Sequence, residues 1–153
     1  MDDDYCVEIW ESAMPWPLSF AVHLWFVTCH AHVVDRIEVW ATLGSFEGVT
    51  LLKNAIAPTA GIRTSFFDNP VTPKKVGKTQ KIFKIKGAPG SAVEKLYRDI
   101  HESLYTYPYL RQYVMWPGPN SNTYVQWVLD RHPEVVIALP RRAFGRNYLK
   151  NKV

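Results

Sequence analysis

One serine, one histidine and one glutamate are the residues of this 153-residue chain best suited to chemistry. Ser121 lies in the segment 116–124, Trp-Pro-Gly-Pro-Asn-Ser-Asn-Thr-Tyr, which places rigid turn residues directly before an expected helix. The start of a helix has free N–H groups and the positive end of the helix dipole. A hydroxyl held there can act as a nucleophile, and we expect the amides of 120–122 to stabilise the oxyanion that forms.

A serine nucleophile needs a base to take its proton and a third group to orient that base. His23 lies in an apolar run typical of a strand, and Glu38 follows fifteen residues later in the next such run. His23 and Glu38 are therefore the residues to consider beside Ser121. The substrate of such a serine would be a small molecule, lipid or peptide, and we expect no cofactor. Aromatic and amide side chains near the polar segment would bind the substrate: Trp25, Trp116, Asn120 and Asn122.

The same residues also fit a non-catalytic function. Asn and Ser are favoured helix N-caps, and Pro-Gly-Pro is ordinary turn chemistry. A histidine in a strand with two apolar faces is also typical of a hydrogen-bonded core residue. The alternative is thus a ligand-binding or scaffolding domain in which the Asn/Ser segment caps a helix. His30 and His32 could share a metal ion, but no third ligand follows at a recognisable spacing, so we expect no metal site.

Composition predicts one globular domain over 1–153, because 47% of the residues are hydrophobic and 21% are charged. The longest apolar stretch, 18–29, is shorter than the ~20 residues that span a bilayer. Acidic residues occupy positions 2–4, where a secretory signal would have Lys or Arg. We therefore expect no membrane-spanning segment and a cytoplasmic location. Cys6 and Cys29 cannot form a disulfide framework and are predicted to be buried thiols.

The net charge of +4 comes from bases gathered in two segments, 74–86 and 141–152. Such segments can attract nucleic acid or another polyanion. The first contains a single aromatic residue, Phe83, and no recognisable binding motif. A solvated loop or edge strand protected by lysines is the simpler interpretation, so we expect no specific nucleic-acid partner. Nothing in the composition indicates an oligomeric state.

Periodicity predicts the elements that position these residues. Short apolar runs bounded by Pro, Asp or Gly predict strands at 4–10, 20–29 and 36–43, with a short strand near 49–53 and a half-exposed one at 79–87. Most of 44–78 should be loop. Apolar residues three and four apart predict an amphipathic helix over 91–106, and a second helix should span 122–130. The fold class is α+β, a small antiparallel sheet packed against two helices. The C-terminal segment should dock on the domain with Leu139, Phe144 and Tyr148 largely buried.

Four short segments resemble an uncharacterised bacterial family, a domain of unknown function. They are the 116–124 box, Phe-Ala-Val-His-Leu-Trp at 20–25, Arg-Ile-Glu-Val at 36–39 and the ending from Leu139 to Tyr148. The family usually has Phe in place of Tyr124 and an acid in place of Asn147. This resemblance implies no activity.

The chain also resembles, more distantly, circularly permuted papain-like amidases and acyltransferases. Those enzymes have a strand histidine, a polar partner on the next strand and a nucleophilic cysteine in an Asn-Cys-x-x-Phe sequence at a later helix start. His23, Glu38 and Ser121 occur in that order, with Ser in place of Cys. The resemblance implies a permuted papain-like topology for the sheet and helices. It also implies an acyl-transfer reaction on an amide or ester, with Ser121 as nucleophile, His23 as general base and Glu38 as orienting acid.

Overall fold

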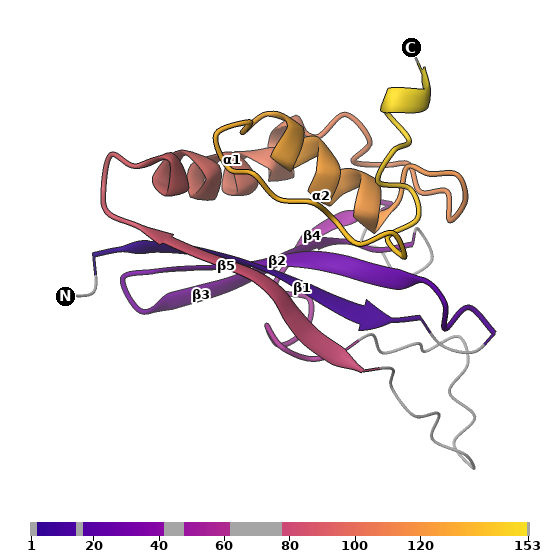
Figure 1. The fold of residues 1–153 in the computed structure, drawn as a ribbon, viewed down its shortest axis with the longest axis horizontal. Helices are drawn as coiled ribbons and strands as arrows, with labels where there is room; N and C mark the ends of the chain where they lie inside the picture. The colour runs from indigo at the N-terminus through magenta and orange to yellow at the C-terminus, as the bar shows by residue number, and fades with distance from the viewer. Residues whose placement is uncertain (1–2, 15–16, 42–47, 62–77, 153) are drawn as a thin grey trace.

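The computed structural model describes residues 3–14, 17–41, 48–61 and 78–152 (Figure 1). The elements follow in the order β1 (Tyr5–Ala13), β2 (Val22–His30), β3 (Val33–Val39), β4 (Leu51–Lys53), β5 (Thr79–Gly87), α1 (Ala92–Thr106), α2 (Ser121–Asp130) and the 3₁₀ turn η2 (Lys150–Lys152). The five strands form one antiparallel sheet in the order β4-β3-β2-β1-β5. Both helices lie on one face of this sheet (Figure 1), which confirms the small α+β fold.

Strand β2 lies at the centre of the sheet, as its two apolar faces predict. Successive side chains of a strand point to opposite faces. On the helix-covered face, Phe26 pairs with Ile9 of β1 and with Ile37 of β3, and all three are fully buried. Apolar residues of α1 and α2 complete this core: Leu96, Ile100, Tyr124, Val125 and Val128. His23 and Trp25 belong to the other set of β2 positions, so they point to the far face.

Helix α1 begins where the sequence predicts. The Ser91 side chain caps it by accepting from the Glu94 N–H at 3.3 Å. The Glu94 carboxylate accepts from the Gly90 N–H at 2.6 Å, one residue before the position that a capping box would use. Among the described residues, no helix has the length and apolar character needed to cross a membrane.

The hairpin between β2 and β3 is tighter than predicted. Ala31 and His32 form its turn, with positive φ values of 48° and 65°. A two-residue turn of this kind matches the twist of antiparallel strands and lets β3 begin immediately at Val33. The predicted start at residue 36 is therefore wrong, because Ala31 and His32 alone make the turn.

The lysine-rich strand β5 lies at an edge of the sheet, as predicted. β5 spans the predicted 79–87 and forms one edge of the sheet. Lys81 and Lys84 of this strand both reach the Glu8 carboxylate of β1, at 3.1 Å and 2.9 Å. Most of the predicted 44–78 loop, with two of the lysines of the basic segment, lies outside the described residues.

The C-terminal segment docks on the domain, but with a different anchor from the one expected. Leu139 is buried as predicted, and the small Ala143 is fully buried. The Phe144 side chain is 36% exposed and Tyr148 is half-buried, so the prediction that both are largely buried is wrong. The Arg142 carbonyl accepts from the Val22 N–H at 3.1 Å and ties the segment to the start of β2.

The two cysteines lie directly opposite each other on β1 and β2, and both are free thiols. Cys6 is buried as predicted, whereas Cys29 is only half-buried because it lies at the end of β2. Burial first, and then the neighbouring Cys29, raises the pKa of the Cys6 thiol to about 11. Cys6 is therefore a protonated, unreactive thiol at neutral pH.

Candidate functional site

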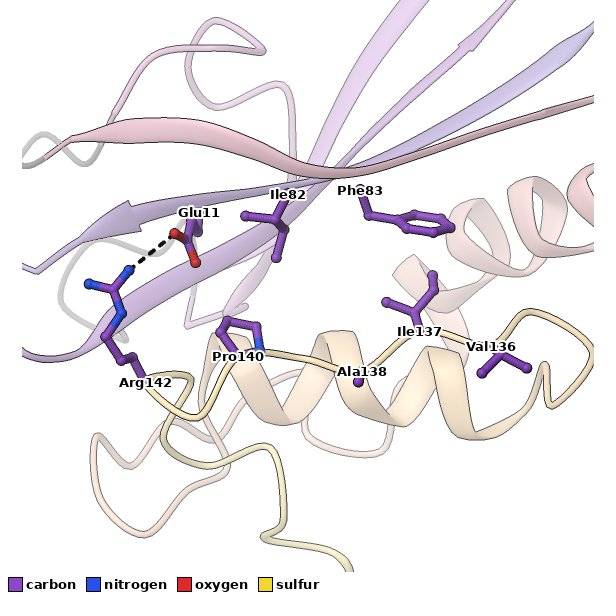
Figure 2. Close-up of a pocket in the computed structure, with 8 residues that line it drawn as sticks. All are labelled: Glu11, Ile82, Phe83, Val136, Ile137, Ala138, Pro140 and Arg142. Carbon is purple, nitrogen blue, oxygen red and sulfur yellow. Dashed lines mark hydrogen bonds and ion pairs between the residues drawn. The ribbon is translucent and has the colours of Figure 1, made fainter.

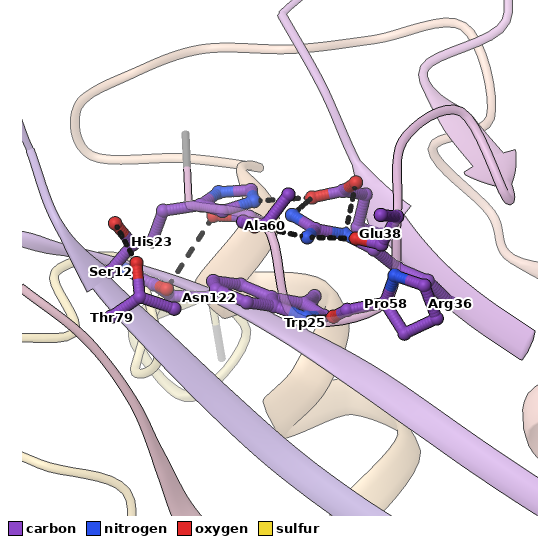
Figure 3. A network of polar contacts seen from close by, with 11 residues as sticks. Ser12, His23, Trp25, Arg36, Glu38, Pro58, Ala60, Thr79 and Asn122 are labelled. Atoms are coloured by element: carbon purple, nitrogen blue, oxygen red, sulfur yellow. Dashed lines mark hydrogen bonds and ion pairs between the residues drawn. The ribbon is translucent and has the colours of Figure 1, made fainter. Parts of the chain in front are cut away.

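A buried ionic network lies on the far face of the sheet, opposite the helices (Figure 3). Its centre is Glu38 of β3, which is 1% exposed. His23 Nε2 lies 2.7 Å from Glu38 Oε2. Arg36, also 1% exposed, donates from Nε to Oε1 at 2.6 Å and from the guanidinium NH2 to Oε2 at 2.7 Å. Bidentate pairing of this kind fixes both the position and the orientation of a carboxylate.

The remaining contacts of the Arg36 guanidinium hold the loop at 57–60 over this face of the sheet. Its other terminal nitrogen donates to the backbone carbonyls of Ala57 and Ala60. Its guanidinium also lies over the Trp25 ring, 4.0 Å from the ring centre, in a cation–π contact. The Trp25 indole N–H donates to the Pro58 carbonyl at 2.9 Å. The loop at 57–60 is thus held by two side chains of the sheet.

The ionisation of Glu38 depends on this pairing. Burial alone would raise the pKa of the carboxyl, but the hydrogen bonds and charges of His23 and Arg36 outweigh it and lower the pKa from 4.5 to about 2. Glu38 is therefore a carboxylate throughout the neutral range. A carboxylate in this position makes Nε2 the protonated nitrogen of a neutral His23 and leaves Nδ1 as the basic nitrogen.

This depressed pKa predicts acid sensitivity. A carboxyl whose pKa is lower in the folded state stabilises the fold above its unfolded value, and that stability is lost as pH falls through the folded value. Glu38 should therefore contribute about 3 kcal/mol that disappears between about pH 5 and pH 2. Urea unfolding at a series of pH values measures this loss. Glu102→Gln is a matched control, because Glu102 lies at an exposed position of α1; an acid limb unaffected by Glu38→Gln would contradict the prediction.

The polar box begins α2 with an asparagine cap. The Asn120 side-chain oxygen accepts from the N–H groups of Asn122 and Thr123, at 3.0 Å and 3.1 Å. The Asn120 N–H in turn donates to Thr123 Oγ1 at 3.1 Å, which completes a capping box. The box therefore caps a helix, and Asn120 is the capping residue. Ser121 is the first residue of the helix.

The amide and hydroxyl donors of the box hold the C-terminal segment and β2. Asn120 Nδ2 donates to the carbonyls of Met115 and Phe144 at 3.0 Å and 3.1 Å. Asn122 Nδ2 donates to the carbonyls of Phe144 and Val22 at 2.8 Å and 2.9 Å. These bonds make the predicted substrate-binding asparagines structural groups as well. They also attach the start of α2 to the residue before His23 (Figure 3).

Gly145 allows the C-terminal segment to lie close enough to Asn120 for these bonds to form. Its φ of 95° lies in the left-handed region that favours glycine. A Cβ at this position would lie 2.4 Å from the Asn120 side-chain amide. In the sequence, Gly145 is a single glycine after Phe144, and nothing in the pattern indicates that the Asn120 side chain packs against it.

Ser121 is the member of the box with the weakest structural bond. Its side chain is buried, and its hydroxyl lies 3.5 Å from Asn122 Oδ1. In the described part of the chain, no hydrogen bond joins it to His23. Of the three amides expected to stabilise an oxyanion, those of Asn120 and Asn122 already donate within the cap. The Ser121 N–H has no acceptor among the described residues.

The two predicted binding tryptophans lie in different environments. Trp25 is fully buried between Arg36 and the sheet. Trp116 is 68% exposed and packs edge-on against Phe144, next to the box. Only Trp116 therefore offers a ring to a ligand from solvent.

The structure thus unites two of the three predicted catalytic residues, His23 and Glu38, in direct contact. It also shows a partner that the sequence interpretation missed. Arg36 lies two positions before Glu38, and residues two apart in a strand share a face. That spacing was the available signal. Within the described ranges, no group of three or more His, Cys, Asp or Glu side chains is placed to hold a metal ion.

Fold and network together define a single-sheet α+β protein with a buried His–Glu–Arg network on the face away from its helices. The chain belongs to a family of proteins of unknown function, DUF3750, whose model matches residues 4–148. No curated protein and no solved structure matches it.

Proposed function

We propose that this protein is an acyl-transfer enzyme, a hydrolase or transferase of amides or esters, in a permuted papain-like frame. The observation that carries the proposal is the His23–Glu38 contact at 2.7 Å, with the carboxylate itself held by Arg36. An oriented, hydrogen-bonded imidazole is the feature that a serine nucleophile needs as its base. Asn122 Nδ2 donates to the Val22 carbonyl, so the helix that begins with Ser121 meets the start of β2 one residue before His23. The His23 ring points to the opposite face of the sheet, so the proposed reaction requires the two side chains to meet around the end of β2.

In the proposed reaction His23 acts first as a base and then as an acid. His23 Nδ1 takes the proton as Ser121 Oγ attacks the acyl carbon, and the Ser121 N–H donates to the oxyanion. His23 then gives the proton to the leaving amine or alcohol. Glu38 keeps the imidazole in the required tautomer and stabilises its charged form. Water, or an acceptor hydroxyl or amine, then attacks the acyl carbon and gives its proton to His23. His23 returns a proton to Ser121 Oγ as the bond between the acyl group and Ser121 breaks.

A serine-directed probe tests the assignment directly. We expect a fluorophosphonate to label Ser121 in the native chain, as located by peptide mass spectrometry. Labelling should be absent in Ser121→Ala and at least about a hundredfold slower in His23→Gln, because an unactivated serine is a poor nucleophile. Ser91→Ala is the matched control, since Ser91 caps α1 and should not affect labelling.

Stability separates catalysis from a structural role in the same variants. Because Asn120 provides the cap and the Ser121 hydroxyl makes only a 3.5 Å contact, Ser121→Ala should change the free energy of unfolding by less than about 1 kcal/mol. Absence of label on Ser121 in a folded native chain, together with ester turnover equal to that of Ser121→Ala, would rule out the enzyme assignment.

One observation favours the second candidate, a non-catalytic ligand-binding or scaffolding domain. The side chains of Asn120, Asn122 and Thr123 are all engaged in bonds that join α2, β2 and the C-terminal segment. This structural role is enough to account for the polar residues of the 116–124 box, without any catalytic function. The labelling experiment distinguishes the two, because this candidate predicts a native Ser121 as inert as other serines of the chain.

A further inference from the structure

A second site lies away from Ser121, in a cleft between β5 and the extended segment 136–142 (Figure 2). The cleft has a volume of about 340 Å³. Ile82 and Phe83 of β5 form one wall, and Ile137 and Pro140 form the facing wall. Glu11 of β1 and Arg142 lie at one end, so the cleft has an apolar body and a charged end (Figure 2).

The Glu11 carboxylate is the unusual group in this cleft. Glu11 is only 3% exposed. Its Oε1 accepts from Gln80 Nε2 at 2.6 Å and from the Arg142 guanidinium at 3.3 Å. Its Oε2 is buried and accepts no hydrogen bond from the described residues. A buried carboxylate oxygen without a donor is costly, so natural structures rarely leave one unpaired.

Gln80 and Arg142 do not supply a donor to Glu11 Oε2 or fully neutralise the carboxylate. Gln80 is neutral, and both contacts are made to Oε1. The Arg142 side chain is 53% exposed, so water screens much of its charge. The end of the cleft therefore retains an acceptor and negative charge that face apolar walls.

We infer that this cleft binds a small primary ammonium compound with an apolar body. The ammonium would donate to Glu11 Oε2, and its compact shape, charge and three N–H groups suit a single free oxygen. The apolar part would lie between the Ile82–Phe83 wall and the Ile137–Pro140 wall. The volume is near the lower end for ligand sites and accommodates on the order of ten non-hydrogen atoms.

Three probes of one shape test the inference on the full chain. They are 2-phenylethylammonium, the neutral 2-phenylethanol and the anionic phenylacetate. Each is titrated into the ¹⁵N-labelled protein and followed in ¹H–¹⁵N correlation spectra. We expect the ammonium to bind with a Kd of about 1 mM and to shift the amides of Ile82, Phe83 and Ile137. The alcohol should bind at least about tenfold more weakly because it lacks the charge, and the anion should not bind.

Two variants locate the site. Glu11→Gln should weaken ammonium binding at least about tenfold. Ala138→Trp fills the cleft from an exposed position and should abolish binding without loss of fold. Glu102→Gln, at an exposed position of α1, should bind like the native chain. Equal binding of ammonium and alcohol, no binding at about 10 mM, or native affinity in Ala138→Trp would each overturn the inference. None of these readouts depends on Ser121.

Discussion

Arg36→Met should destabilise the protein by about 3–5 kcal/mol, a large share of the stability of a domain of this size. The substitution keeps the length of the side chain and removes its charge. Glu38, 1% exposed, would then remain buried with His23 as its remaining side-chain partner among the described residues. The Ala60 carbonyl would lose its Arg36 donor at the same time, and the Ala57 carbonyl would keep the Ala60 N–H. Urea unfolding at pH 7 measures the change.

Arg98→Met is the matched control for this prediction. Arg98 pairs with Glu94 on the exposed surface of α1, and such pairs contribute less than about 1 kcal/mol. The double variant Arg36→Met/Glu38→Gln should be less destabilised than the sum of its single variants, because it no longer buries an unpaired charge. A loss below about 1 kcal/mol for Arg36→Met would show that the network contributes little to the fold.

Asn120→Ala should cost about 2–4 kcal/mol, because it removes a helix cap and two donors together. The cap bonds go to the N–H groups of Asn122 and Thr123, and the donated bonds go to the carbonyls of Met115 and Phe144. Thermal unfolding followed by circular dichroism measures the effect. α2 should also lose protection in amide hydrogen exchange.

Asn120→Asp separates the two functions of this side chain. Aspartate is an equally good cap acceptor, but it cannot donate to the two carbonyls and brings its charge close to them. We expect it to be less stable than the native protein although the helix remains capped. Native stability in Asn120→Asp would mean that the two bonds donated by Asn120 do not contribute to the stability of the fold.

Local patterns were sufficient for most of the secondary structure. Period-two and period-3.6 spacing of apolar residues predicted β5 at its observed bounds and located α1 and α2 to within one residue at each end. These signals work because alternation and helical periodicity depend on neighbours within a few residues. The start of β3 did not follow, because it depends on an Ala31–His32 turn with positive φ, and neither residue is a usual choice for that conformation.

The chain by itself also determined the candidate chemistry, since residue types and order named Ser121, His23 and Glu38. Only the tertiary structure decided their partners. Pairing of β2 with β3 brought His23 and Glu38 together, and the shared strand face added Arg36. The choice of Asn120 over Ser121 as the cap, and the isolation of one Glu11 oxygen in its cleft, likewise depend on where distant segments dock. Such contacts join residues far apart in sequence, so spacing along the chain does not reveal them.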